Sequence, residues 1–332
     1  MSATAPPRPL LAATDLTKHF TVGKTFWPGS GRTLRAVEDV SLEVFPGETL
    51  GLVGESGSGK STLGRCLTRL YTLTAGRLLF DGRDISAAKE RALKPVRLNM
   101  QMIFQDPSAS LNPRRRVRDI VGDVLHVHKI RPAAAIEDRL AELMGLVGLG
   151  GDYLDRYPHE FSGGQRQRIG IARALAVEPK LIVADEPVSA LDVSVQAQIV
   201  NLFNELQERL HLTYVFIAHD LAVVRQVSTR VAVMYLGSIV ETGETDALYS
   251  RPAHPYTEAL LSAIPQPGRR ARGNRILLEG ELPSPLDPPR GCKFSTRCRY
   301  AQARCRTDRP APTAIAGGSR TVACHFPLVA GA

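Results

Sequence analysis

The sequence lacks any long apolar run. Its 332 residues contain no stretch that approaches the roughly 18 consecutive apolar residues of a membrane-spanning helix, and the longest runs are short, such as LIVA at residues 181–184. The N-terminus, MSATAPPRPLLAATDL, also lacks a charged segment followed by a long apolar one, so it does not predict a secretory signal. We therefore expect a protein that stays in the cytoplasm and meets a membrane only through partners.

The sequence also lacks internal repeats, and its length fits about two domains. Residues 36–48 alternate like a strand, and TLGLVG follows as a buried strand that runs into a Gly-rich turn. Short apolar runs bounded by polar turns predict an α/β fold with a mostly parallel sheet. These runs lie at residues 76–82, 99–105, 180–186, 213–220 and 230–243. Helical spacing between Asp106 and Pro179 predicts a helical insertion (about 106–179) in this core.

The composition changes near Arg251, where one short helical segment flanked by prolines gives way to a stretch rich in Arg, Gly and Pro. We place a domain boundary there, with domains at residues 1–250 and 251–332. Residues 266–332 carry 12 Lys and Arg against 4 Asp and Glu, which accounts for most of the net charge of +9. Such a tail either attracts RNA or anionic lipid or forms a solvated, Arg-rich face around an anionic centre; we favour the second interpretation.

GESGSGKS, residues 54–61, is a G-x-x-x-x-G-K-S phosphate loop between a predicted strand and a predicted helix. Its glycines let backbone N–H groups converge on phosphate oxygens, Lys60 adds a positive charge at the β- and γ-phosphates, and Ser61 is a Mg²⁺ ligand. A chance Gly-rich turn before a helix is the alternative. The nucleotide-binding residues predicted here are Gly54, Glu55, Ser56, Gly57, Ser58, Gly59, Lys60, Ser61 and Thr62.

LIVADEP, residues 181–187, is an apolar run that ends in two acids. We expect Asp185 to hold Mg²⁺, directly or through water, and Glu186 to orient or deprotonate the attacking water. The alternative is an acidic turn that caps the next helix. FSGGQ, residues 161–165, begins another helical segment with bare glycine amides suited to an anion. One ATP does not need two such helix ends from one chain, which hints at a site shared between two chains.

With these motifs and three more, FQDP, SALD and FIAHD, the chain resembles the ATP-binding cassette family over about residues 11–245. The resemblance implies a P-loop NTPase fold: a RecA-like core with an antiparallel β subdomain and a helical insertion. It also implies that two cassettes hold two ATP molecules, each between the phosphate loop of one chain and Ser162, Gly163, Gly164 and Gln165 of the other. The signature begins with Phe161 where many members have leucine, an apolar exchange outside the phosphate contacts.

Further roles follow from the resemblance. Gln105 would sense the γ-phosphate and Mg²⁺ and connect to the membrane subunits, His219 would contact the γ-phosphate, and Asp192 would lie at the dimer seam. Phe20 fits best as the aromatic that stacks on adenine, with Phe26 and Trp27 as alternatives. All motifs are intact, so we expect an active ATPase with Glu186, His219 and Gln105 as catalytic residues and with Ser61, Gln105 and Asp185 at Mg²⁺.

HPYTEALLSAIP, residues 254–265, and the segments GCKFSTRC, YAQARC and VACHFP resemble the C-terminal extension of oligopeptide and dipeptide importer ATPases. Nickel and glutathione importers share this extension. One departure is Arg299, where the family usually has proline. The resemblance implies a peptide importer ATPase, or one for nickel, glutathione or another small solute. It implies as partners a second, related cassette, two permeases and an extracytoplasmic binding protein, with this chain peripheral on the cytoplasmic face of the inner membrane.

Four cysteines, Cys292, Cys298, Cys305 and Cys324, lie in this extension. Disulfides are disfavoured in a reducing cytoplasm, and the spacing lacks the close pairs typical of structural zinc. An iron–sulfur cluster tolerates such spacing, and nearby basic residues would offset its charge. The resemblance also points to a 4Fe-4S cluster, while zinc and plain reduced cysteines remain alternatives; His325 could serve as a substitute ligand. These basic residues are Lys293, Arg297, Arg299, Arg304 and Arg306.

A soluble cassette ATPase that acts on nucleic acid is the contending class of protein. Such proteins commonly carry two cassettes in one chain or long coiled-coil insertions. This chain has one cassette and a short helical insertion, so we expect no nucleic acid partner.

Overall fold

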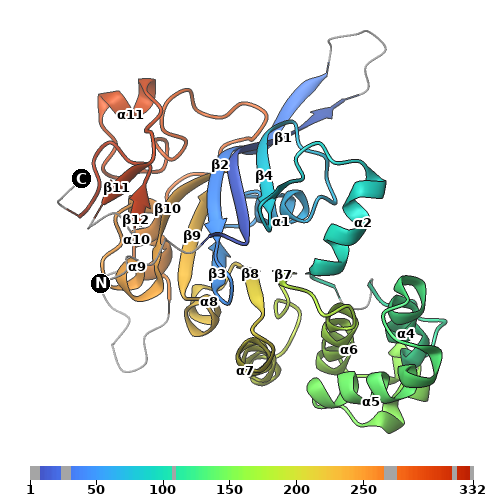
Figure 1. The fold of residues 1–332 in the computed structure, drawn as a ribbon. Helices are drawn as coiled ribbons and strands as arrows, with labels where there is room; N and C mark the ends of the chain where they lie inside the picture. Colours follow the sequence, from blue (N-terminus) through green and yellow to red (C-terminus); the bar gives the residue numbers. More distant parts are fainter. Residues whose placement is uncertain (1–7, 24–30, 107–109, 265–274, 316–319, 330–332) are drawn as a thin grey trace, which may run out of the picture. The chain divides into compact units, whose positions relative to one another are not determined.

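The computed structural model describes residues 8–23, 31–106, 110–264, 275–315 and 320–329 (Figure 1). The chain divides into two compact units. Unit 1 comprises Met1–Val44, Thr49–Ala87 and Ala218–Ala332, and unit 2 comprises Phe45–Glu48 and Ala88–Ile217. Each unit carries a different part of the predicted nucleotide site.

Unit 1 contains an antiparallel sheet in the order β2-β1-β4-β5. Its strands are β1 (Leu11–Val22), β2 (Arg32–Val44), β4 (Ala75–Phe80) and β5 (Arg83–Asp84). The predicted strand at residues 36–48 falls largely in β2, whereas β1 was not predicted. Register shifts interrupt β1 between Ala13 and His19, and Asp15 has a φ of 49°. These irregularities remove the strict alternation by which a strand is recognised in a sequence.

The second sheet region of unit 1 runs in the order β11-β12-β10-β9-β3. Only β3 and β9 pair in parallel here, and the other neighbours are antiparallel. All five residues of β3 are buried, and α8 packs against this strand. The elements are β3 (Thr49–Val53), α1 (Lys60–Leu67), α8 (Leu221–Val227), β9 (Arg230–Tyr235), β10 (Ser238–Glu244), α9 (Thr245–Ser250), α10 (Pro255–Ser262), α11 (Ala303–Thr307), β11 (Thr313–Ile315) and β12 (Arg320–Val322).

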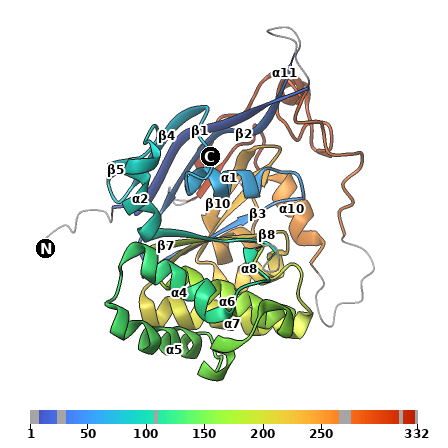
Figure 2. The same cartoon turned by 90° about the vertical axis from the view of Figure 1, so that its right-hand side faces the viewer.

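Unit 2 contains three parallel strands in the order β8-β7-β6 and most of the helices. Helices α4, α5 and α6 pack against one another in Figure 2, and they account for the helical spacing predicted between residues 106 and 179. The elements are α2 (Glu90–Asn99), β6 (Met100–Ile103), α4 (Val117–His128), α5 (Ile136–Leu146), α6 (Gly163–Leu175), β7 (Leu181–Asp185), α7 (Val193–Leu210) and β8 (Thr213–Ala218), with short 3₁₀ helices at Ala133–Ala135, Gly151–Asp155 and Pro158–Glu160.

The C-terminal region, residues 251–332, is held against the rest of unit 1 by strand pairing and by a buried ion pair. Strand β12 pairs with β10, with Glu241 opposite Val322. The Arg320 guanidinium donates to the Glu241 carboxylate at 2.7 Å, and the two side chains are 5% and 0% exposed. Glu241 also accepts hydrogen bonds from the backbone N–H groups of Ala253 and His254, each at 2.9 Å. The buried carboxylate is therefore fully engaged.

An aromatic cluster adds a second attachment. The ring of Phe294 lies 5.2 Å from Tyr235, 5.4 Å from Tyr256 and 5.7 Å from His254, measured between centroids. Phe294, Tyr235, Tyr256 and His254 are all buried, and burial lowers the pKa of His254 to about 3. The neutral imidazole accepts a hydrogen bond from the N–H of Tyr256. This cluster joins the C-terminal region to the end of β9.

The basic residues of the tail are extensively paired within unit 1. The pairs are Lys293 with Glu38, Arg297 with Glu55, Arg299 with Glu258, Arg304 with Asp308, Arg309 with Asp39, and Arg320 with Glu241. Much of the positive charge is thus neutralised by carboxylates of this same chain, which weakens the interpretation as a nucleic-acid-binding stripe.

Replacing Arg320 with alanine is expected to lower the free energy of unfolding of unit 1 by about 3–5 kcal/mol, because Glu241 would be left as an uncompensated buried charge. Denaturant unfolding measures this change. The matched control is Arg304→Ala, which removes an exposed pair with Asp308 and should cost less than about 1 kcal/mol. Equal effects of the two substitutions would contradict the account of how the tail is held.

Candidate functional site

The phosphate loop lies between β3 and α1 in unit 1, as predicted. Gly59, with a φ of 103°, precedes α1, and a Cβ built on it would lie 2.3 Å from the carbonyl oxygen of Ala36. A Cβ on Gly54 would lie 2.2 Å from the carbonyl oxygen of Met234. Glycine is therefore required at both positions, and α1 begins at Lys60 with its N-terminal N–H groups behind the loop.

Lys60, at the end of this loop, binds the backbone at its beginning. Its side chain is buried, and Nζ donates to the carbonyl oxygens of Gly54 at 2.8 Å and of Glu55 at 3.0 Å. Ser58 is fully buried, and its Oγ has no hydrogen-bond partner among the described residues. A buried hydroxyl without a partner, a glycine-lined turn and a helix N-terminus fit a phosphate group. The donor set of this loop therefore suits ATP.

The two predicted acids lie at the end of β7 in unit 2. Asp185 is the last residue of the strand and is 1% exposed. Glu186 follows with a φ of 46°, and its N–H donates to the carbonyl oxygen of Ile217 at 2.9 Å. Gln105 Nε2 donates to Glu186 Oε2 at 3.0 Å. The structure thus brings Gln105 and Glu186 together, and the left-handed backbone at Glu186 is the kind of strain that accumulates at functional sites.

The FSGGQ segment caps α6 in unit 2. Ser162 Oγ accepts from the N–H of Gln165 at 3.3 Å, and Gln165 Oε1 accepts from the N–H of Ser162 at 3.0 Å, which is a capping box. A Cβ on Gly164 would lie 2.4 Å from Cγ1 of Val195 in α7. Phe161 is buried against Tyr153, with centroids 5.6 Å apart, so it acts as an apolar anchor for the segment.

The other predicted residues lie near the starts of helices or in the antiparallel sheet. Asp192 is exposed directly before α7, and Val193 next to it is 82% exposed. His219 is exposed after β8, and Asp220 next to it caps α8. Phe20 lies in β1, edge-on to Tyr71 at 5.5 Å. The alternatives Phe26 and Trp27 lie outside the described residues.

The cysteine prediction needs correction. Within the residues that the structure describes, no group of three or more His, Cys, Asp or Glu side chains is placed to hold a metal ion. The expected 4Fe-4S cluster, its zinc alternative and His325 as a ligand are therefore not supported, and the metal-binding assignment of the tail is wrong.

All four tail cysteines are free thiols that line one small cavity together with Phe294, Tyr300 and Phe326. Burial raises the pKa of Cys292 and Cys298, and that of Cys324 to about 11, so these sulfurs favour the protonated thiol. Lining one cavity is not sufficient to hold a metal ion, and the tail is held instead by the β12 pairing and the Phe294 cluster.

Two functional contacts were missed in the sequence. Tyr256 and Arg297 of the C-terminal region hydrogen-bond to Glu55 in the phosphate loop. These two residues lie 201 and 242 positions from Glu55 in the chain, so no local sequence pattern predicts the contacts.

Comparisons with known proteins agree with this geometry. The family described as ABC transporter matches residues 37–189, and the family described as oligopeptide/dipeptide transporter, C-terminal region, matches residues 240–305. The oligopeptide transport ATP-binding protein AppF of Bacillus subtilis is 51% identical over 320 residues, which is 96% of this chain and 97% of AppF. OppF of Salmonella typhimurium, also named an oligopeptide transport ATP-binding protein, is 51% identical over 91% of this chain and 92% of OppF.

Among solved structures, the ATP-binding cassette MJ0796, a dimer in a post-hydrolysis state bound to ADP and Pi, superposes with a TM-score of 0.63 at 26% identity. The match covers 71% of this chain and 98% of MJ0796. It confirms the predicted P-loop NTPase fold, although the sheet is mixed where the sequence predicted mostly parallel strands. None of the described helices is long and apolar enough to cross a membrane. The chain belongs to the ABC transporter family, as an ATP-hydrolysing subunit whose C-terminal region is of the oligopeptide/dipeptide transporter type.

Proposed function

We propose that this chain powers peptide import: it hydrolyses ATP as one of two cassettes that drive two membrane permeases, which receive substrate from an extracytoplasmic binding protein. The observation that carries the proposal lies in unit 1, where the C-terminal region of the oligopeptide/dipeptide type binds the phosphate loop directly through Tyr256 and Arg297. The names of the relatives AppF and OppF support the same substrate class. The chain would lie at the cytoplasmic face of the membrane, held there by the permeases.

In this proposal Lys60 and the amides at the start of α1 bind the β- and γ-phosphates. Ser61 in unit 1, and Asp185 and Gln105 in unit 2, would each offer an oxygen of the kind that Mg²⁺ prefers, and a bound ion would neutralise phosphate charge. Glu186, hydrogen-bonded to Gln105, orients the attacking water and accepts its proton. His219 contacts the γ-phosphate, and Phe20 stacks on adenine.

Dimerisation is part of the proposal. The start of α6, capped by Ser162 and Gln165, would face the ATP of the second cassette with its N–H groups. Asp192, exposed directly before α7, would lie at the seam.

Reconstitution in proteoliposomes tests the proposal. The chain is purified with the two proposed permeases and the second cassette, and ATP turnover is followed as binding protein loaded with a dipeptide or an oligopeptide is added. We expect peptide to stimulate turnover and to accumulate in the compartment opposite the ATP. Stimulation by nickel or glutathione alone would contradict peptide as the substrate while leaving the ATPase assignment intact.

A further inference from the structure

Glu55, the second residue of the phosphate loop, is clamped by two residues of the C-terminal region. Its backbone N–H donates to Tyr256 Oη at 2.9 Å. Its carboxylate accepts two hydrogen bonds from Arg297, from Nη1 to Oε2 at 2.6 Å and from Nη2 to Oε1 at 3.2 Å. The clamp thus fixes both the main chain and the side chain of one loop residue.

The clamp is rigid on the side of the C-terminal region. The Arg297 side chain is 8% exposed against 29% for Glu55, and the hydrogen bond from Arg297 to Glu55 raises the pKa of Arg297 further above its usual value. The N–H of Arg297 donates to the carbonyl oxygen of Phe294 at 3.0 Å, which holds the turn that presents the guanidinium. Tyr256 is buried against Tyr235 and Phe294. A largely buried guanidinium that makes a bidentate contact with a loop carboxylate is well placed to hold the loop in one conformation.

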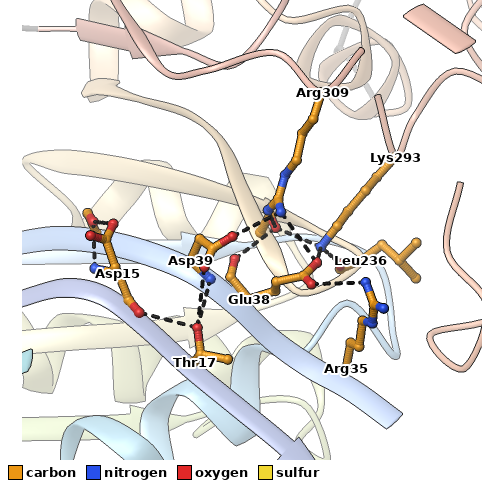
Figure 3. A network of polar contacts seen from close by, with 10 residues as sticks. Asp15, Thr17, Arg35, Glu38, Asp39, Leu236, Lys293 and Arg309 are labelled. Atoms are coloured by element: carbon orange, nitrogen blue, oxygen red, sulfur yellow. Dashed lines mark hydrogen bonds and ion pairs between the residues drawn. The ribbon is translucent and has the colours of Figure 1, made fainter. Parts of the chain in front are cut away.

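A second contact from the same segment reaches the loop through the turn between β9 and β10. Lys293 Nζ donates to the carbonyl oxygen of Leu236 and to Ser238 Oγ, both at 2.8 Å, and pairs with Glu38 (Figure 3). Leu236 has a φ of 42°, an uncommon conformation for leucine, so Lys293 helps to hold a strained turn. The next residue, Gly237, donates its N–H to the carbonyl oxygen of Ser58 at 2.8 Å.

The clamp has an electrostatic consequence for nucleotide binding. Glu55 places a carboxylate on a loop whose proposed ligand is a polyanion, and like charges repel. Arg297 neutralises that carboxylate and keeps it turned toward the C-terminal region. Without Arg297, the negative charge and the freed loop would both oppose phosphate binding.

We infer that Arg297 is a positioning residue for ATP binding: through Glu55 it sets the conformation and the charge of the phosphate loop, and it thereby makes ATP affinity depend on the folded C-terminal region. This inference rests on the proposed role of residues 54–61 as the phosphate site. It gives the tail a function in the ATPase itself, beyond its membership of a transporter type.

Steady-state kinetics of Arg297→Ala in the full chain test the inference. We expect the KM for ATP to rise about tenfold while kcat stays within about twofold, since the loss falls on binding. The matched control is Arg299→Ala, whose pair with Glu258 is exposed and includes no residue of the phosphate loop, and its KM should not change. An unchanged KM in Arg297→Ala would overturn the inference.

The double variant Glu55→Gln with Arg297→Ala separates the effect of the unpaired Glu55 carboxylate from a general loss of structure. Because it removes the unpaired carboxylate, we expect its KM to return to within about threefold of the original value. No recovery would mean that the unpaired Glu55 carboxylate does not oppose ATP binding, and that outcome also overturns the inference. If Arg297→Ala fails to fold, Arg297→Lys keeps the charge but loses the bidentate contact with Glu55. The KM of Arg297→Lys for ATP should rise about threefold, and no rise would refute the inference.

Absence of ATPase activity in the unsubstituted chain would instead refute the proposed function.

Discussion

Replacing Glu186 with glutamine is expected to slow ATP hydrolysis by at least about 100-fold while ATP still binds. Glutamine keeps the shape of the side chain, and its oxygen can still accept the hydrogen bond that Gln105 donates to Glu186. It cannot accept a proton from water, so the loss falls on the chemical step rather than on ground-state binding. Single-turnover hydrolysis and calorimetric ATP binding measure the two effects separately.

The matched control for this substitution is Glu208→Gln on α7, an exposed position of the same residue type. Its turnover should equal that of the unsubstituted chain. If Glu186→Gln hydrolysed ATP at the original rate, Glu186 would have no part in the mechanism, and its hydrogen bond with Gln105 would have only a structural role.

Replacing Lys60 with alanine is expected to weaken ATP binding by about 100-fold, because hydrogen bonds to charged groups contribute about 1.5–3 kcal/mol each. In the proposed site Lys60 would supply the positive charge for the phosphates, and in the structure its Nζ donates to the carbonyl oxygens of Gly54 and Glu55. The side chain is buried, so solvent cannot replace either contribution. Calorimetry measures the affinity directly.

Lys94→Ala, at an exposed position of α2, serves as the control for the loss of one lysine. The control should bind ATP normally, and both variants should retain the helical circular dichroism of the folded chain. Normal ATP affinity in Lys60→Ala would argue against residues 54–61 as the phosphate site.

The parts of the account that were predicted from the sequence are those in which short contiguous segments carry the chemistry. The phosphate loop, the acids at the end of β7 and the glycines at the start of α6 each occupy fewer than about ten residues, and each depends on local backbone geometry. Gly59 illustrates this, since its left-handed φ and the nearby carbonyl of Ala36 leave no room for a side chain. Such constraints are visible in a single sequence.

Long-range arrangements were not predicted. Strands β11 and β12 have three residues each, too few to show a period; β12 is stabilised by pairing with β10, and β11 by pairing with β12. The Arg297–Glu55 pair joins residues 242 apart in the chain. The four tail cysteines do gather at one cavity, but within the described residues they form no group placed to hold a metal ion, and the spacing along the chain could not show this. In each case the tertiary packing supplies information that local patterns lack.

Peptide-stimulated ATP turnover in proteoliposomes is the most direct test of the central claim, that this chain couples ATP hydrolysis to peptide uptake. We predict that turnover rises when peptide-loaded binding protein is added to the complete assembly, and that Glu186→Gln abolishes both the stimulated turnover and the accumulation of peptide. Peptide accumulation that continues without hydrolysis by this chain would contradict the account.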